Sequence, residues 1–147
     1  MRFHDRIGGA ALVASFAVAL AAAATAAAQE TPLARGRYLV TTVMACGNCH
    51  TPKDAQGRPI AGKELAGGGI TIDIPPFAAT APNITPDRAT GIGGWSDAEI
   101  KRAITQGIGR DGRTLEAPMA YPWYAGIRAD DLDAIVAYLR TLPPLPR

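Results

Sequence analysis

Residues 46–50 read Cys-Gly-Asn-Cys-His, and they hold both cysteines of the chain and one of its two histidines. Two thiols at this spacing reach the two vinyl groups of one porphyrin and become thioethers, while the imidazole of the next residue falls under the iron. The motif therefore predicts one covalently bound haem c. Cys46 and Cys49 are the expected covalent anchors, and His50 is the expected proximal ligand of the haem iron.

Two other kinds of site also use a Cys-x-x-Cys pair. A thioredoxin-type redox pair opens a helix that follows a strand of a βαβ unit, and no β-rich run precedes Cys46. A zinc site needs a fourth protein ligand. The only other histidine is His4, which lies in a segment expected to be removed, so the residues favour haem attachment over both alternatives.

The first 28 residues have the pattern of a secretory signal peptide. Arg2 and Arg6 precede an alanine-rich apolar run, and Ala26-Ala27-Ala28 provides small residues at a cleavage site. We expect cleavage after Ala28 and, because c-type haem is attached outside the bacterial cytoplasm, a location in the periplasm. The alternative is a retained membrane anchor, since residues 7–28 are nearly long enough to span a bilayer.

Residues 29–147 amount to a single domain. The whole chain has 15 Lys and Arg and 13 Asp and Glu, and removing Arg2, Arg6 and Asp5 leaves 13 and 12. This near balance provides no basic patch for nucleic acid and no polybasic tail for a membrane surface. A membrane is expected as a partner only if the N-terminal segment is retained.

The first of three predicted helices begins at Thr31-Pro32, an N-cap followed by proline at the first helical position, and runs to about Met44. Gly36 lies within it. A glycine inside a helix costs about 1 kcal/mol relative to alanine, which favours a packing role in which another helix approaches closely.

The second predicted helix opens with the capping box Ser96-Asp97-Ala98-Glu99 and ends at Gly107. The third runs from about Ala129 to Thr141, with Asp130 and Asp131 at the positive end of its dipole. Each helix has one apolar face, formed in the second by Ile100, Ala103 and Ile104 and in the third by Leu132, Ile135, Val136 and Leu139.

Two long stretches lack helical periodicity. Residues 51–95 are rich in Gly and Pro, and a loop of this length suits a compact domain only if it wraps a large apolar cofactor. Ile70, Ile72 and Ile74 alternate within it, which predicts a short strand or an extended lining segment. Residues 110–124 are a second predicted loop, with Pro118-Met119 near the centre.

The sixth iron ligand follows by elimination. Without a second histidine outside the predicted signal, a thioether, a lysine amine or an open site remain. Met44 lies two residues before Cys46, on the attachment side, so Met119 is the methionine expected to reach the opposite face. A methionine with a histidine raises the reduction potential relative to two histidines.

For Trp95 two roles stay open: its indole N–H donates to a haem propionate, or its ring packs as a buried aromatic.

With these features in place, the chain resembles a class I cytochrome c. More narrowly, it resembles the haem domains of cytochrome c subunits that serve periplasmic dehydrogenases of the alcohol, aldehyde and molybdenum hydroxylase types. The segments that carry the second resemblance are residues 81–87 (Ala-Pro-Asn-Ile-Thr-Pro-Asp), 90–96 (Thr-Gly-Ile-Gly-Gly-Trp-Ser), 110–113 (Arg-Asp-Gly-Arg) and 118–119 (Pro-Met).

The resemblance implies an all-α fold, with three main helices and long loops around one haem, and a crossing of the first and last helices near Gly36 and Tyr138. It implies a one-electron carrier that accepts electrons from a periplasmic dehydrogenase and passes them to the respiratory chain through a cytochrome or a terminal oxidase. It also makes Asn83, Thr85 and Arg113 weaker candidates for contacts with the haem propionates.

The chain departs from these relatives at two positions. Ala120 stands where relatives commonly have a proline after the methionine, and Arg128 stands where they have a serine or aspartate cap. We therefore expect a looser methionine loop and a weaker start of the last helix. A different functional class, a haem enzyme with an open distal site such as a peroxidase, requires distal acid/base groups, and no distal histidine is present.

Overall fold

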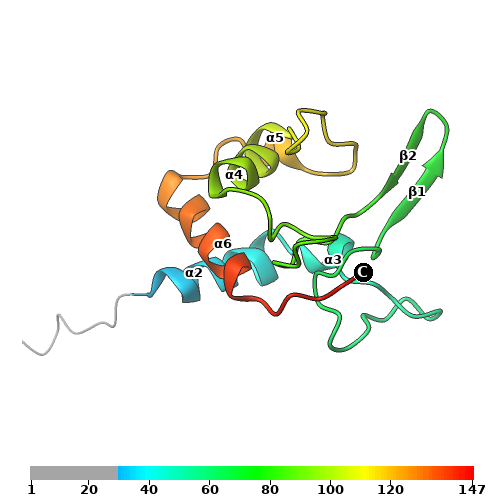
Figure 1. Cartoon of the computed structure of the whole chain (residues 1–147), viewed down its shortest axis with the longest axis horizontal. Helices are drawn as coiled ribbons and strands as arrows, with labels where there is room; N and C mark the ends of the chain where they lie inside the picture. The colour runs from blue at the N-terminus through cyan, green and yellow to red at the C-terminus, as the bar shows by residue number, and fades with distance from the viewer. Residues whose placement is uncertain (1–29) are drawn as a thin grey trace, which may run out of the picture. The chain divides into compact units, whose positions relative to one another are not determined.

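The computed structural model describes residues 30–147, so the predicted signal peptide lies outside the described residues. Residues from Thr31 to Arg147 form one unit, which is described here by itself (Figure 1). Its elements are, in order, α2 (Pro32–Tyr38), η1 (Leu39–Val43), α3 (Gly47–His50), β1 (Thr71–Ile74), β2 (Phe77–Thr80), α4 (Asp97–Gln106), α5 (Tyr121–Tyr124) and α6 (Ala129–Thr141).

The first predicted helix has the expected extent but two kinds of turn. The side chain of Thr31 accepts a hydrogen bond from the backbone N–H of Ala34 at 3.2 Å, and Pro32 occupies the first helical position, so the predicted start is confirmed. After Tyr38 the chain continues as η1, a π-helical segment that ends at Met44. The wider turn of a π-helix is uncommon and often found at functional sites.

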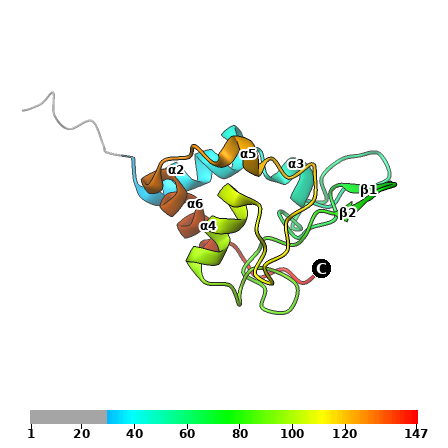
Figure 2. The same ribbon diagram turned by 90° about the horizontal axis from the view of Figure 1, so that it is seen from above.

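Helices α2 and α6 lie side by side and cross at Gly36 (Figures 1 and 2). A Cβ atom on Gly36 would lie 1.9 Å from the carbonyl oxygen of Ala134 and 2.9 Å from Cβ of Tyr138. The predicted crossing is therefore confirmed, and only glycine allows so close an approach. Arg35 and Asp131 form an ion pair from α2 to α6, with 2.7 Å between Nε and Oδ1.

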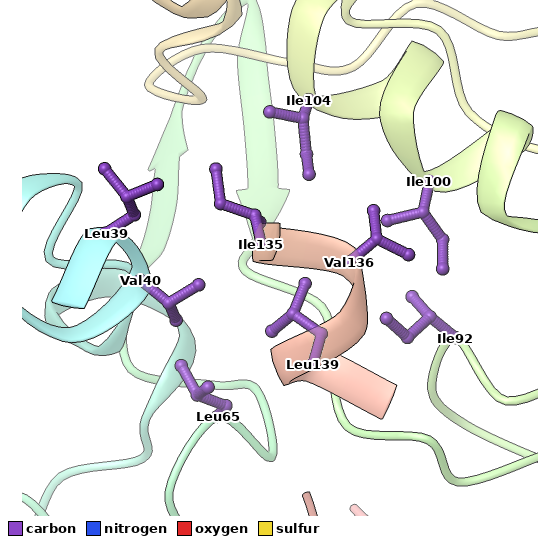
Figure 3. Packing of buried hydrophobic residues seen from close by; sticks show 9 residues of the cluster. All are labelled: Leu39, Val40, Leu65, Ile92, Ile100, Ile104, Ile135, Val136 and Leu139. Atoms are coloured by element: carbon purple, nitrogen blue, oxygen red, sulfur yellow. The ribbon is translucent and has the colours of Figure 1, made fainter. Parts of the chain in front are cut away.

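Helix α4 has the predicted boundaries. Ser96 and Glu99 form the capping box, and Gly107 ends the helix with a φ of 67°. The apolar faces of η1, α4 and α6 meet in one core, together with single residues of the loops (Figure 3). The buried members are Leu39, Val40, Leu65, Ile92, Ile100, Ile104, Ile135, Val136 and Leu139.

The remaining elements correct the expectation of an all-α chain. Strands β1 and β2 form an antiparallel hairpin in which Thr71 pairs with Thr80, and it projects from the loop region away from the helices (Figure 1). The predicted strand is confirmed, and Ile74, at its end, is 68% exposed. Helix α5 adds a helical turn inside the second predicted loop.

Helix α6 begins without a side-chain cap at Arg128, as its sequence predicts. Arg128 instead pairs with Asp130, with 2.7 Å between Nη2 and Oδ2. No helix within residues 30–147 is both long and apolar enough to cross a membrane.

Candidate haem-attachment site

The motif folds as a single helical turn, α3, which Met44, Ala45 and Cys46 separate from η1. The backbone N–H of His50 donates to the carbonyl of Cys46 at 2.9 Å, and that of Thr51 donates to Gly47 at 3.1 Å. Residues three apart lie on the same side of a helical turn, so Cys46 and Cys49 share one face. Both are free thiols, available for thioether formation.

The imidazole of His50 is oriented by the backbone of a distant loop. Its ring is buried, with 8% of the residue exposed, and Nδ1 lies 2.8 Å from the carbonyl oxygen of Pro82. A carbonyl oxygen only accepts hydrogen bonds, so Nδ1 carries the hydrogen and Nε2 keeps its lone pair. This carbonyl contact fixes both the tautomer and the ring plane of a metal-binding histidine.

Burial also sets the protonation states at the turn. It lowers the pKa of His50, which keeps the imidazole neutral as a ligand must be. It raises the pKa of the Cys46 thiol to about 11, whereas a redox-active Cys-x-x-Cys depends on a stabilised thiolate. Within residues 30–147, no three His, Cys, Asp or Glu side chains are grouped to hold a metal ion. A protonated Cys46 thiol and a neutral His50 imidazole fit haem c better than zinc or a disulfide exchange centre.

A glycine-rich segment packs directly on the backbone of this turn. The N–H of Gly67 donates to the carbonyl of His50 at 2.6 Å. A Cβ atom on Gly69 would lie 2.1 Å from the carbonyl oxygen of Thr51 and 2.6 Å from that of Cys49. Gly69 therefore lets this loop lie close against the attachment turn, a role that the composition alone did not reveal.

Asn83 and Thr85, two of the candidate propionate contacts, are buried and bonded within the chain. The amide nitrogen of Asn83 donates to Oγ1 of Thr90 at 2.9 Å and to the carbonyl of Leu145 at 2.7 Å. Its Oδ1 accepts from both the N–H and the hydroxyl of Thr85. Together they fasten the loop after Pro82 to the C-terminal residues. A propionate contact by either one remains a prediction.

The other two propionate candidates differ in their exposure. Trp95 is half-buried against the core, and the guanidinium of Arg140 donates to its carbonyl. Arg113 is exposed and pairs with Asp111, with 2.6 Å between Nε and Oδ2. Their propionate roles remain predictions.

The two methionines border different apolar hollows on the surface. Met119 is half-buried and lines a hollow of about 330 Å³ with Pro118 and Tyr121. Met44, at the end of η1, lines another of about 460 Å³ with Tyr124. Trp123 borders both and is 81% exposed. The division of the two methionines between the haem faces and iron ligation by Met119 both remain predictions.

A family model described as cytochrome c matches residues 33–143. The chain belongs to the cytochrome c family. Its membership supports haem c as the cofactor of the attachment turn, in agreement with the donor set of Cys46, Cys49 and His50.

This cytochrome c is similar in sequence to subunits of several dehydrogenases. It is 38% identical over 113 residues to a nicotinate dehydrogenase subunit of Pseudomonas putida, a match that covers 77% of this chain and 9% of that protein. It is 35% identical over 121 residues to the gluconate 2-dehydrogenase cytochrome c subunit of Pantoea cypripedii, covering 82% of this chain and 25% of that one.

The cytochrome c subunit of the quinone alcohol dehydrogenase of Gluconobacter oxydans is 35% identical over 129 residues, which cover 88% of this chain and 25% of the subunit. The chain thus spans a quarter or less of the length of these three relatives. The resemblance to cytochrome c subunits of dehydrogenases, predicted from the sequence, is confirmed.

Proposed function

We propose that this cytochrome c is a one-electron carrier of class I fold. It holds a single haem c through Cys46 and Cys49, with His50 and Met119 as the axial ligands of the iron. The attachment turn supports this most directly: Nδ1 of His50 donates to the Pro82 carbonyl at 2.8 Å, which leaves Nε2 free for a metal beside two free thiols.

The bound haem iron supplies a one-electron couple between its ferric and ferrous states. One electron enters from the reduced cofactor of a dehydrogenase and one leaves to an oxidised cytochrome or terminal oxidase, so the carrier returns to its starting state. Within this chain, His50 and Met119 would both bind the iron and would leave no open position for a substrate. The buried cluster around Val40 and Ile135 keeps water from the protein interior.

The proposed partner is a periplasmic dehydrogenase, and the similarity to dehydrogenase subunits supports the dehydrogenase. The predicted signal peptide supports the periplasm as the compartment. We infer that docking uses apolar contacts, because residues 29–147 are nearly balanced in charge. The sequence places these contacts around Cys46, Gly47 and residues 78–82, and the exposed side chains of Val43 and Trp123 add to the apolar surface.

The first experiment separates a carrier from a haem enzyme. The purified haem protein is titrated electrochemically, mixed with a soluble cytochrome acceptor, and assayed for oxidation of guaiacol by hydrogen peroxide. A carrier gives a reversible one-electron transition, rapid exchange with the acceptor and no turnover with peroxide. Rapid turnover with peroxide favours an open sixth site and contradicts the proposal. Failure to exchange with the acceptor indicates an assembly subunit instead.

The second experiment tests the docking chemistry. Stopped-flow reduction by the cognate dehydrogenase is followed as the salt concentration rises. Apolar docking gives a rate that changes little, because long-range steering accounts for a small part of the association. A rate that falls by orders of magnitude towards about 0.15 M salt, where the Debye length is about 8 Å, indicates a focused charge patch.

A further inference from the structure

Gly107, at the C-terminal end of α4, contacts both ends of the segment that carries Met119. Its carbonyl accepts a hydrogen bond from the N–H of Leu115 at 2.6 Å, four residues before the methionine. Its Cα faces the ring of Tyr121, two residues after the methionine, so closely that a Cβ atom would lie 2.4 Å from Cδ1 and 2.5 Å from Cγ and Cε1. The two ends of residues 115–121 therefore both contact Gly107.

Two properties make this position specific for glycine. Its φ of 67° lies in the left-handed region, where a Cβ atom is strained. The ring of Tyr121 also occupies the space that a side chain would need. Gly112 has the first property without the second, since its φ is 81° and nothing lies within 4 Å of a Cβ built there.

The helix beneath this contact is firmly placed. Ile100 and Ile104 anchor α4 in the core, and the capping box of Ser96 and Glu99 fixes its start. Between the two contacts with Gly107, the backbone N–H of Met119 donates to the carbonyl of Glu116 at 3.2 Å. Gly107 is thus one of the links between the methionine and the core, beside the Ile108–Thr114 bridge before the segment and the packing of Tyr124 on the core after it.

We propose that Gly107 is a positioning residue for the sixth iron ligand. By holding Leu115 and Tyr121 on the end of α4, it keeps the Met119 thioether on the iron and so limits the fraction of molecules with an open sixth position. This inference rests on the proposed ligation of the iron by Met119. In this proposal, the end of α4 limits ligand exchange at the iron and helps to set the reduction potential of the haem.

The test compares Gly107→Ala with Gly112→Ala in the haem-loaded protein. Both variants carry the strain of a left-handed alanine, but only the first drives a Cβ atom into the ring of Tyr121. Added imidazole binds only molecules from which Met119 has left the iron, so its apparent affinity scales with the open fraction. We expect Gly107→Ala to bind imidazole at least about tenfold more tightly than Gly112→Ala, with a weaker methionine-to-iron absorption band and a lower potential.

Tyr121→Ala provides a second variant without backbone strain, and a cycle with Gly107→Ala isolates their coupling. We expect Tyr121→Ala to raise the imidazole affinity by itself. In its background, Gly107→Ala should add no more than Gly112→Ala does. If the two glycine variants bind imidazole equally well, or if Tyr121→Ala leaves the affinity unchanged, the inference is wrong.

The wild-type protein distinguishes this failure from failure of the proposed function. A wild-type methionine-to-iron band that Met119→Ala abolishes supports the ligation, so equal glycine variants would then overturn the role of Gly107 alone. A wild-type protein without that band, whose imidazole affinity is the same in Met119→Ala, overturns the ligation and this inference with it.

Discussion

The attachment turn and the methionine segment are held in different ways. Contacts from two other parts of the chain converge on the turn. Gly67 and Leu65, from one loop, bond to the His50 carbonyl and the Thr51 hydroxyl, and Pro82, from a later loop, bonds to the His50 ring. The methionine segment, residues 115–121, contacts Gly107 at the end of α4 with both of its ends. Pro118 within it and the following Pro122 and Trp123 are exposed.

The difference indicates where the molecule is rigid and where it adjusts. A segment with many buried contacts opens only with global unfolding, whereas one with few contacts opens locally at a lower free energy. We therefore expect the His50 side to remain unchanged among variants that fold. The Met119 side is expected to set ligand exchange and fine differences in reduction potential.

The largest effect should follow from removing the histidine of the turn. His50→Ala should nearly abolish haem-loaded protein, because the buried neutral imidazole is the only strong iron ligand that this side provides. Cys46→Ala and Cys49→Ala should each leave at most one thioether. The measurement is haem staining on a denaturing gel after expression with the c-type maturation system.

Asn48→Ala is the matched control for these variants, since Asn48 lies inside the motif but is exposed. It should retain the wild-type yield of covalent haem. A normal yield from the His50 variant would show that the turn does not carry the proximal ligand.

Variants at the sixth-ligand methionine should bind added ligands more readily while keeping the covalent haem. Met119→Ala should keep covalent haem, lose the methionine-to-iron band, lower the potential and bind imidazole at least about tenfold more tightly, because no internal ligand competes. Met44→Ala should do none of these, since Met44 ends η1 next to the attachment turn. Loss of the band in Met44→Ala instead of Met119→Ala would reverse the assignment of the two faces.

The parts of the fold that local chemistry determines were predictable. The proline start at Pro32, the capping box at Ser96 and the glycine end at Gly107 each depend on hydrogen bonds within a few residues. The crossing at Gly36 was predictable too, because a helical glycine without a packing role is costly. The weak start of α6 followed from the absence of an oxygen acceptor on Arg128.

What the sequence did not reveal depends on distant backbone groups. The carbonyl of Pro82 orients His50 across 32 residues, and any residue at that position provides a carbonyl. The close contact of Gly69 with Cys49 is likewise a property of the folded loop. The alternation of Ile70, Ile72 and Ile74 predicted a strand, but the pairing of that strand with β2 and the π-helical turn of η1 carry no strong local signal.

A change at the crossing of α2 and α6 should lower the stability of the whole fold without affecting the attachment turn or the methionine segment. Gly36→Ala places a Cβ atom 1.9 Å from the Ala134 carbonyl oxygen, and such overpacking costs about 1–3 kcal/mol. The better helix propensity of alanine, about 1 kcal/mol, offsets part of this cost. Thermal unfolding should show a lower Tm, while the methionine-to-iron band stays at its wild-type intensity.

Gly126→Ala is the control, since nothing lies within 4 Å of a Cβ atom built on Gly126 and its backbone is not in the left-handed region. Its Tm should match that of the wild type. An unchanged Tm for Gly36→Ala would mean that α2 and α6 do not cross as closely as the structure has them.

The smallest effect concerns the loop that carries the Pro82 carbonyl. Oδ1 of Asp87 accepts hydrogen bonds from the N–H of Thr90 at 2.6 Å, from its hydroxyl at 2.8 Å and from the N–H of Ala89 at 3.1 Å. These bonds hold the pKa of Asp87 below its ordinary value. A depressed carboxyl pKa stabilises the folded state above the unfolded pKa of about 3.9, and the contribution is lost as the pH falls through the folded pKa.

Asp87→Asn removes the charge while leaving one oxygen acceptor, so its Tm should be slightly lower than that of the wild type near neutral pH. The difference should shrink as the pH falls below about 3.9, because the wild-type carboxyl then becomes protonated too. Thermal unfolding of the haem-loaded protein at several pH values measures it, with Asp73→Asn, an exposed carboxylate on β1, as the control. A Tm difference that is the same at neutral and acid pH would show that the charge of Asp87 does not stabilise this loop. A change in the methionine-to-iron band of Asp87→Asn would show that the loop beside His50 and the segment around Met119 are coupled, contrary to the separation that the contacts indicate.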